Sequence, residues 1–238
     1  MGMQARLEEL FAGRHFDRDV IILCVRWYLR FRLSLRDLVE MMAERGLSLA
    51  HTTIMRWVQH HTPEFEKRWH QHALGVGRSW RVDETYVKIW GVWHYSYRAV
   101  DRAGRTVDFR LSTRRDVAAA KACFRKAIKN QQCLPRTITL DGYAPSHRAV
   151  RELKFDGWLL TETQLRSSKY LNNVIEQDHR GAKQRVAAML GFKQFRNAAI
   201  TIAGIGLMHR IRKGQFGLRR VGVQSGAAPA IWNAILGA

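Results

Sequence analysis

Three acidic residues stand at positions where a folded chain could use them for chemistry. Asp83 lies in the middle of a predicted strand, Asp141 ends another, and Glu176 lies on a predicted helix. A carboxylate inside a half-buried strand must pair, bind a metal ion or take up a proton, because burying it bare is costly. Together they form the all-oxygen ligand set that Mg²⁺ prefers. Two such ions, about 3.5–4 Å apart, would activate an attacking oxygen and stabilise a leaving one in phosphodiester chemistry.

The segment YLNNVIEQDHRGAKQR, residues 170–185, predicts a helix that surrounds one of these acids with polar and basic side chains. At 3.6 residues per turn, one helix face carries Asn173, Glu176, Arg180 and Lys183. The two cations would neutralise a phosphate, and the amide would orient a ligand. An ordinary salt-bridged surface stripe would have the same spacing.

Each strand acid also has a structural explanation. Asp83 could pair with Arg81 or Lys88, and Asp141 could shape the turn that follows it. The neighbouring Glu84 is expected to point to the other strand face and not to be a ligand.

Other candidate groups are weaker. Trp90 and Trp93 are expected in the core rather than as base-stacking platforms. A zinc site among the histidines is disfavoured, because those histidines have no cysteine partners.

The pattern of the second half of the chain predicts a mixed α/β domain. Alternating aromatic and β-branched residues predict strands, followed by alternating helices and strands. The strands are expected at residues 79–90, 92–101, 106–112, 136–141 and 157–163. The helices are expected at residues 115–130, 146–153 and 195–214. This order predicts an RNase H-like catalytic domain over residues 79–190, followed by a basic helix and tail over 191–238 whose last 20 residues are loose.

The first 62 residues predict an all-α domain of the helix-turn-helix type. Helical spacing of apolar residues recurs at 18–31, 33–46 and 51–61, with Ser34 as an N-cap. The outer face of the third helix carries side chains that can bond base edges or phosphates. They are Thr52, Thr53, Arg56, Gln59 and His60. A linker helix is expected over 63–78, and a plain helical bundle is the alternative for the whole region.

The charge of the chain points to a polyanionic partner. Forty Lys and Arg against 20 Asp and Glu give a formal net charge of +20. Residues 1–77 carry only +2 of it, and no acid follows Asp178. Nucleic acid is the first candidate partner and an acidic membrane surface the second.

Other features favour a cytoplasmic protein. The three cysteines are far apart in the sequence and form no disulfide framework, which is typical of a reducing compartment. The N-terminus lacks the apolar stretch of a signal peptide, and the apolar run at 198–208 is too short to span a bilayer.

Three motifs give this chain a family resemblance. WRVDETYVKIWG, TLDG and NNVIEQDHRGAKQR resemble the acid motifs of DDE transposases, and are most similar to those of the bacterial family of insertion sequences 6 and 26. Asp141 and Glu176 have 34 residues between them, as that family requires, and Lys183 follows where the family carries a basic partner. HTTIMRWVQHHTPEFEKRW resembles its helix-turn-helix and linker, and the likeness covers roughly residues 14–215.

The resemblance implies a transposase with Asp83, Asp141 and Glu176 as metal-binding catalytic acids and Lys183 as a further catalytic group. Such an enzyme would use two Mg²⁺ ions, which Mn²⁺ can replace. It would bind terminal inverted repeats of double-stranded DNA, free a 3′-hydroxyl and transfer it to target DNA, forming cointegrates. Arg180 and Lys183 would contact DNA. A homodimer or higher homo-oligomer at the bacterial nucleoid is implied, with no membrane partner and no small-molecule substrate.

Two other functions remain open from the sequence. The chain could be a DNA-binding regulator with an inactive catalytic domain, although such a domain has no physical need for three intact acids. It could also be an RNase H-type nuclease that cuts without joining, because the same metals activate water and a 3′-hydroxyl.

Overall fold

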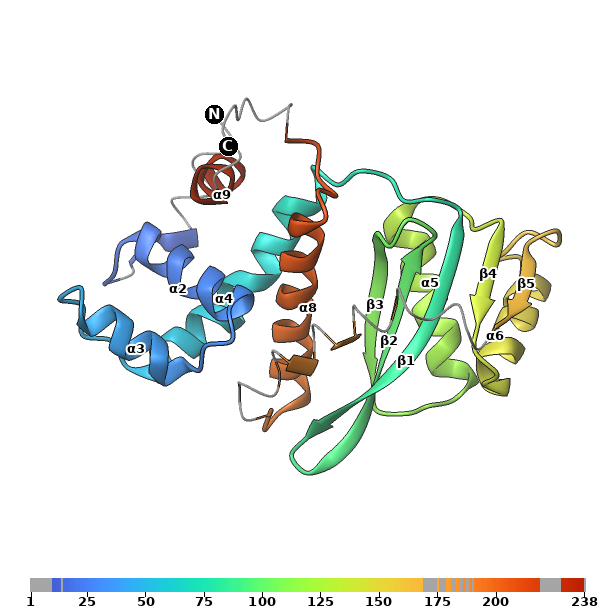
Figure 1. Cartoon of the computed structure of the whole chain (residues 1–238), viewed down its shortest axis with the longest axis horizontal. Coiled ribbons are helices and arrows are strands. Elements are labelled where there is room, and N and C mark those ends of the chain that lie inside the picture. Colours follow the sequence, from blue (N-terminus) through green and yellow to red (C-terminus); the bar gives the residue numbers. More distant parts are fainter. Residues whose placement is uncertain are drawn as a thin grey trace. The chain divides into compact units, whose positions relative to one another are not determined.

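The computed structural model describes residues 10–13, 15–168, 191–218 and 228–237, together with Ile175, His179, Arg180, Lys183, Gln184, Val186 and Met189. These residues belong to two compact units (Figure 1). The first unit, here the helical unit, takes in residues 1–74, 185–190 and 196–238. The second, the sheet unit, takes in residues 75–184 and 191–195.

The helical unit begins with three helices, as predicted. They are α2 (Arg18–Arg30), α3 (Leu35–Ala43) and α4 (His51–His70). The predicted N-cap Ser34 is confirmed: its hydroxyl accepts from the Asp37 N–H at 3.1 Å, and the Asp37 carboxylate accepts from the Ser34 N–H at 2.7 Å. This reciprocal capping box fixes where α3 starts.

Helix α4 differs from the sequence prediction. It runs without a break through Pro63, so the expected division into a recognition helix and a separate linker helix over 63–78 is not seen. Proline inside a helix costs one backbone hydrogen bond and strains the preceding turn. The buried stripe of Ile54, Val58, Phe65 and Trp69 continues across the proline at helical spacing, and its packing outweighs that cost.

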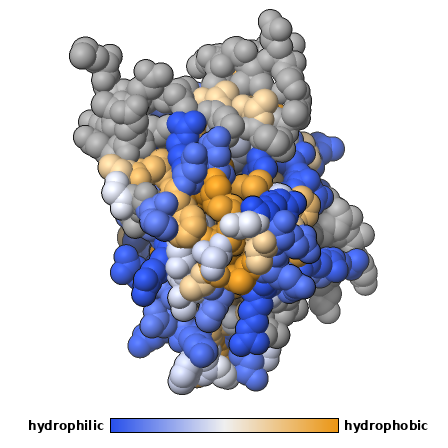
Figure 2. All heavy atoms as spheres, turned by 90° about the vertical axis from the view of Figure 1, so that its left-hand side faces the viewer, coloured by the Kyte–Doolittle hydropathy of each residue, from blue (hydrophilic) through white to orange (hydrophobic). Residues whose placement is uncertain are grey.

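Two C-terminal helices complete the core of the helical unit. They are α8 (Phe195–Arg212) and α9 (Ala228–Gly237). The expectation of a loose tail is wrong for α9, because Trp232, Ile235 and Leu236 are almost completely buried in the same apolar cluster as α2 and α4. Figure 2, a view from the side on which α2 and α3 are labelled in Figure 1, shows mostly hydrophilic side chains around a hydrophobic centre.

The sheet unit contains one five-stranded sheet with the order β3-β2-β1-β4-β5. The strands are β1 (Ser79–Ile89), β2 (Val92–Asp101), β3 (Thr106–Ser112), β4 (Thr137–Leu140) and β5 (Gln164–Ser167). The first three form an antiparallel meander, while β1–β4 and β4–β5 pair in parallel. This order is that of an RNase H-like sheet, so the predicted α/β fold class is confirmed.

Two helices cover one face of this sheet (Figure 1). They are α5 (Val117–Gln131) and α6 (Ala144–Phe155). Phe124 of α5 and Leu153 of α6 pack into one cluster with Trp80 and Ile138 of the central strands. Both helices therefore lie on the face that carries the even-numbered side chains of β1.

The last strand lies later in the chain than predicted. The expected strand at 157–163 is a turn after α6, with Gly157 in the left-handed region at φ +74° and Leu159 buried. Gln164 begins β5 by donating its N–H to the Arg136 carbonyl at 2.8 Å. Of the apolar residues in 157–163, Leu159 is buried, whereas Trp158 and Leu160 are exposed. The polar β5 is an edge strand.

The β1–β2 hairpin ends in a two-residue turn formed by Trp90 and Gly91, with φ of 49° and 77°. Trp90 is 71% and Trp93 56% exposed, so the expectation that both lie in the core is wrong. The strands there extend past the helix-covered part of the sheet, which leaves the rings of the hairpin without a core to enter. Among the residues that the structure describes, no helix is both long and apolar enough to cross a lipid bilayer.

Candidate active site

Strand register brings two of the predicted acids together. Arg81 on β1 pairs with Thr139 on the parallel neighbour β4. Asp83 and Asp141 each follow two residues later, so the backbone places them side by side at the ends of the pairing. The first is held inside a long strand, and the second stands where β4 has just ended.

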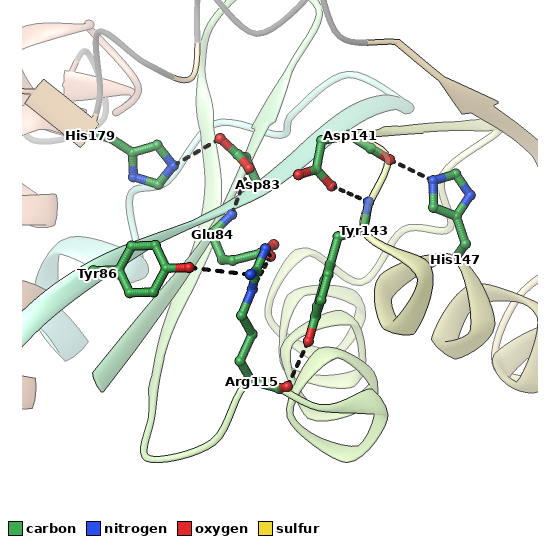
Figure 3. A network of polar contacts seen from close by, with 8 residues as sticks. All are labelled: Asp83, Glu84, Tyr86, Arg115, Asp141, Tyr143, His147 and His179. Carbon is green, nitrogen blue, oxygen red and sulfur yellow. Dashed lines mark hydrogen bonds and ion pairs between the residues drawn. The ribbon is translucent and has the colours of Figure 1, made fainter. Parts of the chain in front are cut away.

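A third carboxylate belongs to the same group. Asp83, Glu84 and Asp141 each offer one oxygen, and these three atoms lie within 4.8 Å of one another. Asp83 and Glu84 leave the strand in opposite directions, as alternation requires (Figure 3). Glu84 thus points to the other strand face, as the sequence predicts, although its carboxylate remains near both aspartates. That it is not a metal ligand stays a prediction.

Each aspartate is held by a neighbouring backbone N–H. Asp83 Oδ1 accepts from the Glu84 N–H at 2.9 Å, and Asp141 Oδ1 accepts from the Tyr143 N–H at 3.0 Å. The Asp141 carbonyl also accepts from His147 Nε2 at 2.6 Å. The two backbone N–H bonds fix one oxygen of each carboxylate.

On the opposite side of β1 from α5 and α6, a buried histidine approaches Asp83. His179 Nε2 lies 3.7 Å from Asp83 Oδ2, and the imidazole is only 7% exposed (Figure 3). The pair is an ion pair only when the histidine is protonated.

Glu84 is tied to a cation. Arg115 Nε donates to Glu84 Oε1 at 2.7 Å, and Arg115 Nη2 pairs with the same oxygen. Burial raises the pKa of Glu84, and the hydrogen bond and charge of Arg115 oppose that rise. Because the side chain of Glu84 is only 3% exposed, Arg115 is its main source of neutralising charge.

The third predicted acid, Glu176, lies outside the described residues, as does Asn173. Four described neighbours, Ile175, His179, Arg180 and Lys183, are helical. Of these, Ile175 and His179 are buried, whereas Arg180 and Lys183 are exposed.

The predicted DNA-binding residues of α4 are not equivalent in the structure. Thr52, Arg56 and His60 are exposed and recur every fourth residue, so they share one helix face, while Thr53 is half-buried. Gln59 differs, because its amide donates to Thr201 Oγ1 of α8 at 3.3 Å. That contact directs Gln59 into the helical unit.

Sequence reasoning missed four polar residues of the site. His179 had a signal, because it lies three residues after Glu176 on the predicted helix and so shares its face. Tyr143 follows Asp141 by two residues and His147 lies in the first turn of α6, so both are close to Asp141 along the chain. Arg115 is distant in sequence from both aspartates, and only the fold brings it to the acids.

The donor set fits a hard divalent cation. Asp83 and Asp141 present carboxylate oxygens within reach of a common ion, and Mg²⁺ binds through one or two carboxylates plus water and phosphate oxygens.

Comparisons with known proteins identify relatives of this chain. A family described as a DDE domain matches residues 77–215. The chain is 37% identical over 203 residues to the transposase for the insertion sequence-like element IS431mec of Staphylococcus aureus (strain N315), covering 85% of this chain and 88% of the relative. It has the same identity and coverage with the transposase for insertion sequence element IS257 in transposon Tn4003 of Staphylococcus aureus.

Solved structures show a more distant likeness. The catalytic core domain of BIV integrase matches with a TM-score of 0.42 and 20% identity, over 55% of this chain and 83% of that one. The HTLV-2 integrase catalytic core domain in complex with magnesium matches with a TM-score of 0.42 and 14% identity, over 55% and 84%.

Proposed function

The chain belongs to the DDE transposases, and from that premise we propose that it cuts DNA at the ends of an insertion sequence and joins the freed 3′-hydroxyl to target DNA. DDE transposases are metal-dependent polynucleotidyl transferases. The proposed substrates are terminal inverted repeats and a target duplex in the bacterial cytoplasm, at the nucleoid. The proposed product is a cointegrate of donor and target.

One observation carries the catalytic assignment. Asp83 lies on β1 and Asp141 directly after β4, yet a carboxylate oxygen of each lies within 4.8 Å of the other. Two like charges at this separation repel each other, and that repulsion is a cost to the fold unless a cation relieves it. We assign both aspartates, together with Glu176 from its motif, as ligands of two Mg²⁺ ions, which Mn²⁺ can replace. When bound, such ions supply Lewis acidity at the attacking and leaving oxygens.

The protein's own groups have separate roles in this proposal. The Glu84 and Tyr143 N–H groups orient the two aspartates. Lys183, an exposed helical cation, neutralises a phosphate oxygen and binds no metal, because its ammonium repels a divalent cation. Arg180, one turn earlier, contacts the same backbone.

The exposed face of α4 is the proposed reader of the inverted repeat. Thr52, Arg56 and His60 line it, and an arginine that bonds a guanine edge discriminates bases by about 1–3 kcal/mol. We leave Gln59 out of this proposed face, because its amide donates to Thr201 within the helical unit. Because two element ends must be cut in concert, the active form is proposed to be a homodimer or higher homo-oligomer.

Strand transfer from pre-nicked repeat DNA tests the proposal. Asp83→Asn, Asp141→Asn and Glu176→Gln each remove a ligand charge with little change in shape, so each is expected to abolish cleavage and transfer in Mg²⁺ while repeat binding remains. Asp156→Asn, an acid-to-amide change at the end of α6, is the control and should keep activity.

The outcomes separate the alternatives. Cleavage without joining by the wild-type protein would identify a nuclease. Repeat binding with neither reaction would identify a regulator. Near wild-type transfer by any one of the three site variants would remove that residue from the site.

A further inference from the structure

One arginine connects the segments that carry the two aspartates. Arg115, in the loop between β3 and α5, binds Glu84 with two of its nitrogens. Its guanidinium carbon lies 3.7 Å from the ring centroid of Tyr143, and its Nη1 donates to the Tyr86 hydroxyl at 3.2 Å (Figure 3). The Tyr143 hydroxyl in turn donates to the Arg115 carbonyl at 2.6 Å.

The contacts of Arg115 reach both aspartates through one further residue each. Glu84, which it binds, donates its N–H to Asp83. Tyr143, on which it stacks, donates its N–H to Asp141. Loss of the guanidinium would therefore loosen both N–H donors together.

Arg115 also decides where the third carboxylate points. Glu84 has an oxygen within 4.8 Å of the other two acids and is nearly inaccessible to water. A buried carboxylate deprived of its cation is strongly unfavourable. A divalent cation at the aspartates would then be the nearest positive charge for it.

We propose that Arg115 is a positioning residue that keeps Glu84 out of the metal site and holds Asp83 and Asp141 in their working arrangement. The inference rests on the proposed function, because it assumes that these aspartates bind the metal. Arg115 touches neither substrate nor metal in this role.

The test combines Arg115→Ala with the double variant Arg115→Ala/Glu84→Gln. Misplaced ligands should lower strand transfer by Arg115→Ala roughly 10–100-fold. The double variant should recover most of this loss, because the freed carboxylate is gone. Binding of Mn²⁺ to the protein without DNA, followed by electron paramagnetic resonance, should be tighter in Arg115→Ala than in the double variant.

A matched control lies on α5 in the same unit. Arg125 also pairs with an acid, Asp156 at 3.2 Å, and stacks over an aromatic ring, Trp158 at 5.3 Å, away from the site. Arg125→Ala should keep full transfer and normal Mn²⁺ binding. Arg115→Lys, which keeps the charge but loses the forked geometry, should retain part of the activity and covers the case in which Arg115→Ala does not fold.

Specific results would overturn the inference. The inference fails if the double variant is no more active than Arg115→Ala, or if Arg115→Ala and the double variant bind Mn²⁺ equally. It also fails if a loss of DNA affinity by Arg115→Ala accounts for its whole loss of strand transfer. If Asp83→Asn and Asp141→Asn are inactive while Arg115→Ala resembles wild type, only this inference fails. If the aspartate variants are active, the proposed function fails.

An independent observation concerns the tip of the β1–β2 hairpin, residues 86–95, here the aromatic hairpin. Trp90 adopts the left-handed region at φ 49°, which bulky side chains rarely enter. Its side chain is 71% exposed, so burial does not offset this strain. Strain of this kind concentrates at functional positions.

The chemistry of the aromatic hairpin fits a nucleic-acid strand. Lys88 and Trp93 face each other across the strands, with the ammonium 5.5 Å from the ring centroid. Tyr86 lies edge-on to Trp93 at 6.1 Å and also contacts Arg115, so the surface continues to the acids. The hairpin has no acidic residue. A second copy of this basic chain would have to bury Lys88 against like charge. DNA, in contrast, has bases that can stack on the tryptophan rings and phosphates that can pair with Lys88.

We infer that the aromatic hairpin holds a single DNA strand that flanks the reacting phosphodiester, with bases on Trp90 and Trp93 and a phosphate on Lys88. This inference also rests on the proposed function. Asp83 and Lys88 are five residues apart on β1, or about 17 Å at 3.4 Å per residue, so the bound DNA strand would have to continue past the hairpin for several nucleotides to reach the aspartates.

Fluorescence anisotropy with two probes tests this surface: a repeat end with a single-stranded flank, and the same end fully duplex. Trp93→Ala removes one stacking platform for a base, so its affinity for the flanked probe should fall about 5- to 150-fold. Its affinity for the fully duplex probe should fall less. Trp158→Ala, which removes another exposed indole beside an arginine, is the control.

Equal affinity of Trp93→Ala and wild type for the flanked probe, or an equal loss in the control, would refute the inference. Dissociation of an oligomer by Trp93→Ala without loss of flank binding would instead assign the hairpin to an interface between copies.

Discussion

Trp232 provides a stringent test of the C-terminal helix. Its side chain is 1% exposed, and its ring centroid lies 5.7 Å from that of Phe65 and 5.6 Å from that of Trp69. A buried tryptophan removes about 150–250 Å² from water, which corresponds to about 4–6 kcal/mol at 25 cal/mol per Å². Truncation of buried aromatic residues typically costs about 3–5 kcal/mol, because the cavity partly relaxes. We therefore expect Trp232→Ala to lower the free energy of unfolding of the helical unit by about 3–5 kcal/mol.

Urea unfolding of wild type and variant measures this change. Two compact units can unfold in separate transitions, so hydrogen exchange of the α4 amides identifies the transition that shifts. Trp158→Ala, with 41% of its side chain exposed in the sheet unit, should leave that transition within about 0.5 kcal/mol of wild type. A loss below about 1 kcal/mol for Trp232→Ala would show that α9 adds little to the core, because core truncations cost several times more.

Two further changes test packing and charge. Gly204→Ala should lower the melting temperature although alanine favours helices by about 1 kcal/mol, because its Cβ would lie 2.7 Å from side-chain atoms of Leu29 and Thr62; a higher melting temperature would contradict this. Lys121 binds Glu152 and Asp156 at 3.0 and 2.8 Å and, chiefly by hydrogen bonding, lowers the pKa of both. Their contribution to stability is present above their usual pKa near 4 and is lost as the pH falls through the lowered values. Lys121→Met should therefore melt below wild type at pH 7 and at the same temperature in stronger acid, whereas a difference that persists in acid would point to packing.

The strands of the meander were predictable because local rules decide them. Residues 79–112 alternate strongly, and their turns contain glycine, so pattern and turn chemistry agree. The adjacency of Asp83 and Asp141 was predictable only as a family motif. Its physical cause is the parallel register of β1 and β4, two strands that β2, β3 and α5 separate in the chain.

The wrong predictions share a physical cause. The helix 51–70 continues through Pro63, residues 157–163 turn rather than pair, and α9 packs rather than remaining loose. In each case contacts with distant parts of the chain outweigh the local preference for a break, a strand or a coil. Trp90 and Trp93 differ from these cases. Their apolar side chains predicted burial, but the hairpin extends beyond the core and both residues are exposed.

The placement of Glu84 explains why adjacent acids in one strand need not have the same function. Because side chains alternate along β1, Asp83 points toward His179, whereas Glu84 points toward the face of α5 and binds Arg115 there. If Glu84 were a metal ligand, Arg115 would compete with the metal for it, and binding would have to break a buried ion pair at considerable cost. If Glu84 instead serves as the anchor for Arg115, the same contacts cost nothing when metal binds. The arrangement thus favours two aspartates as ligands and a glutamate that holds the loops around them.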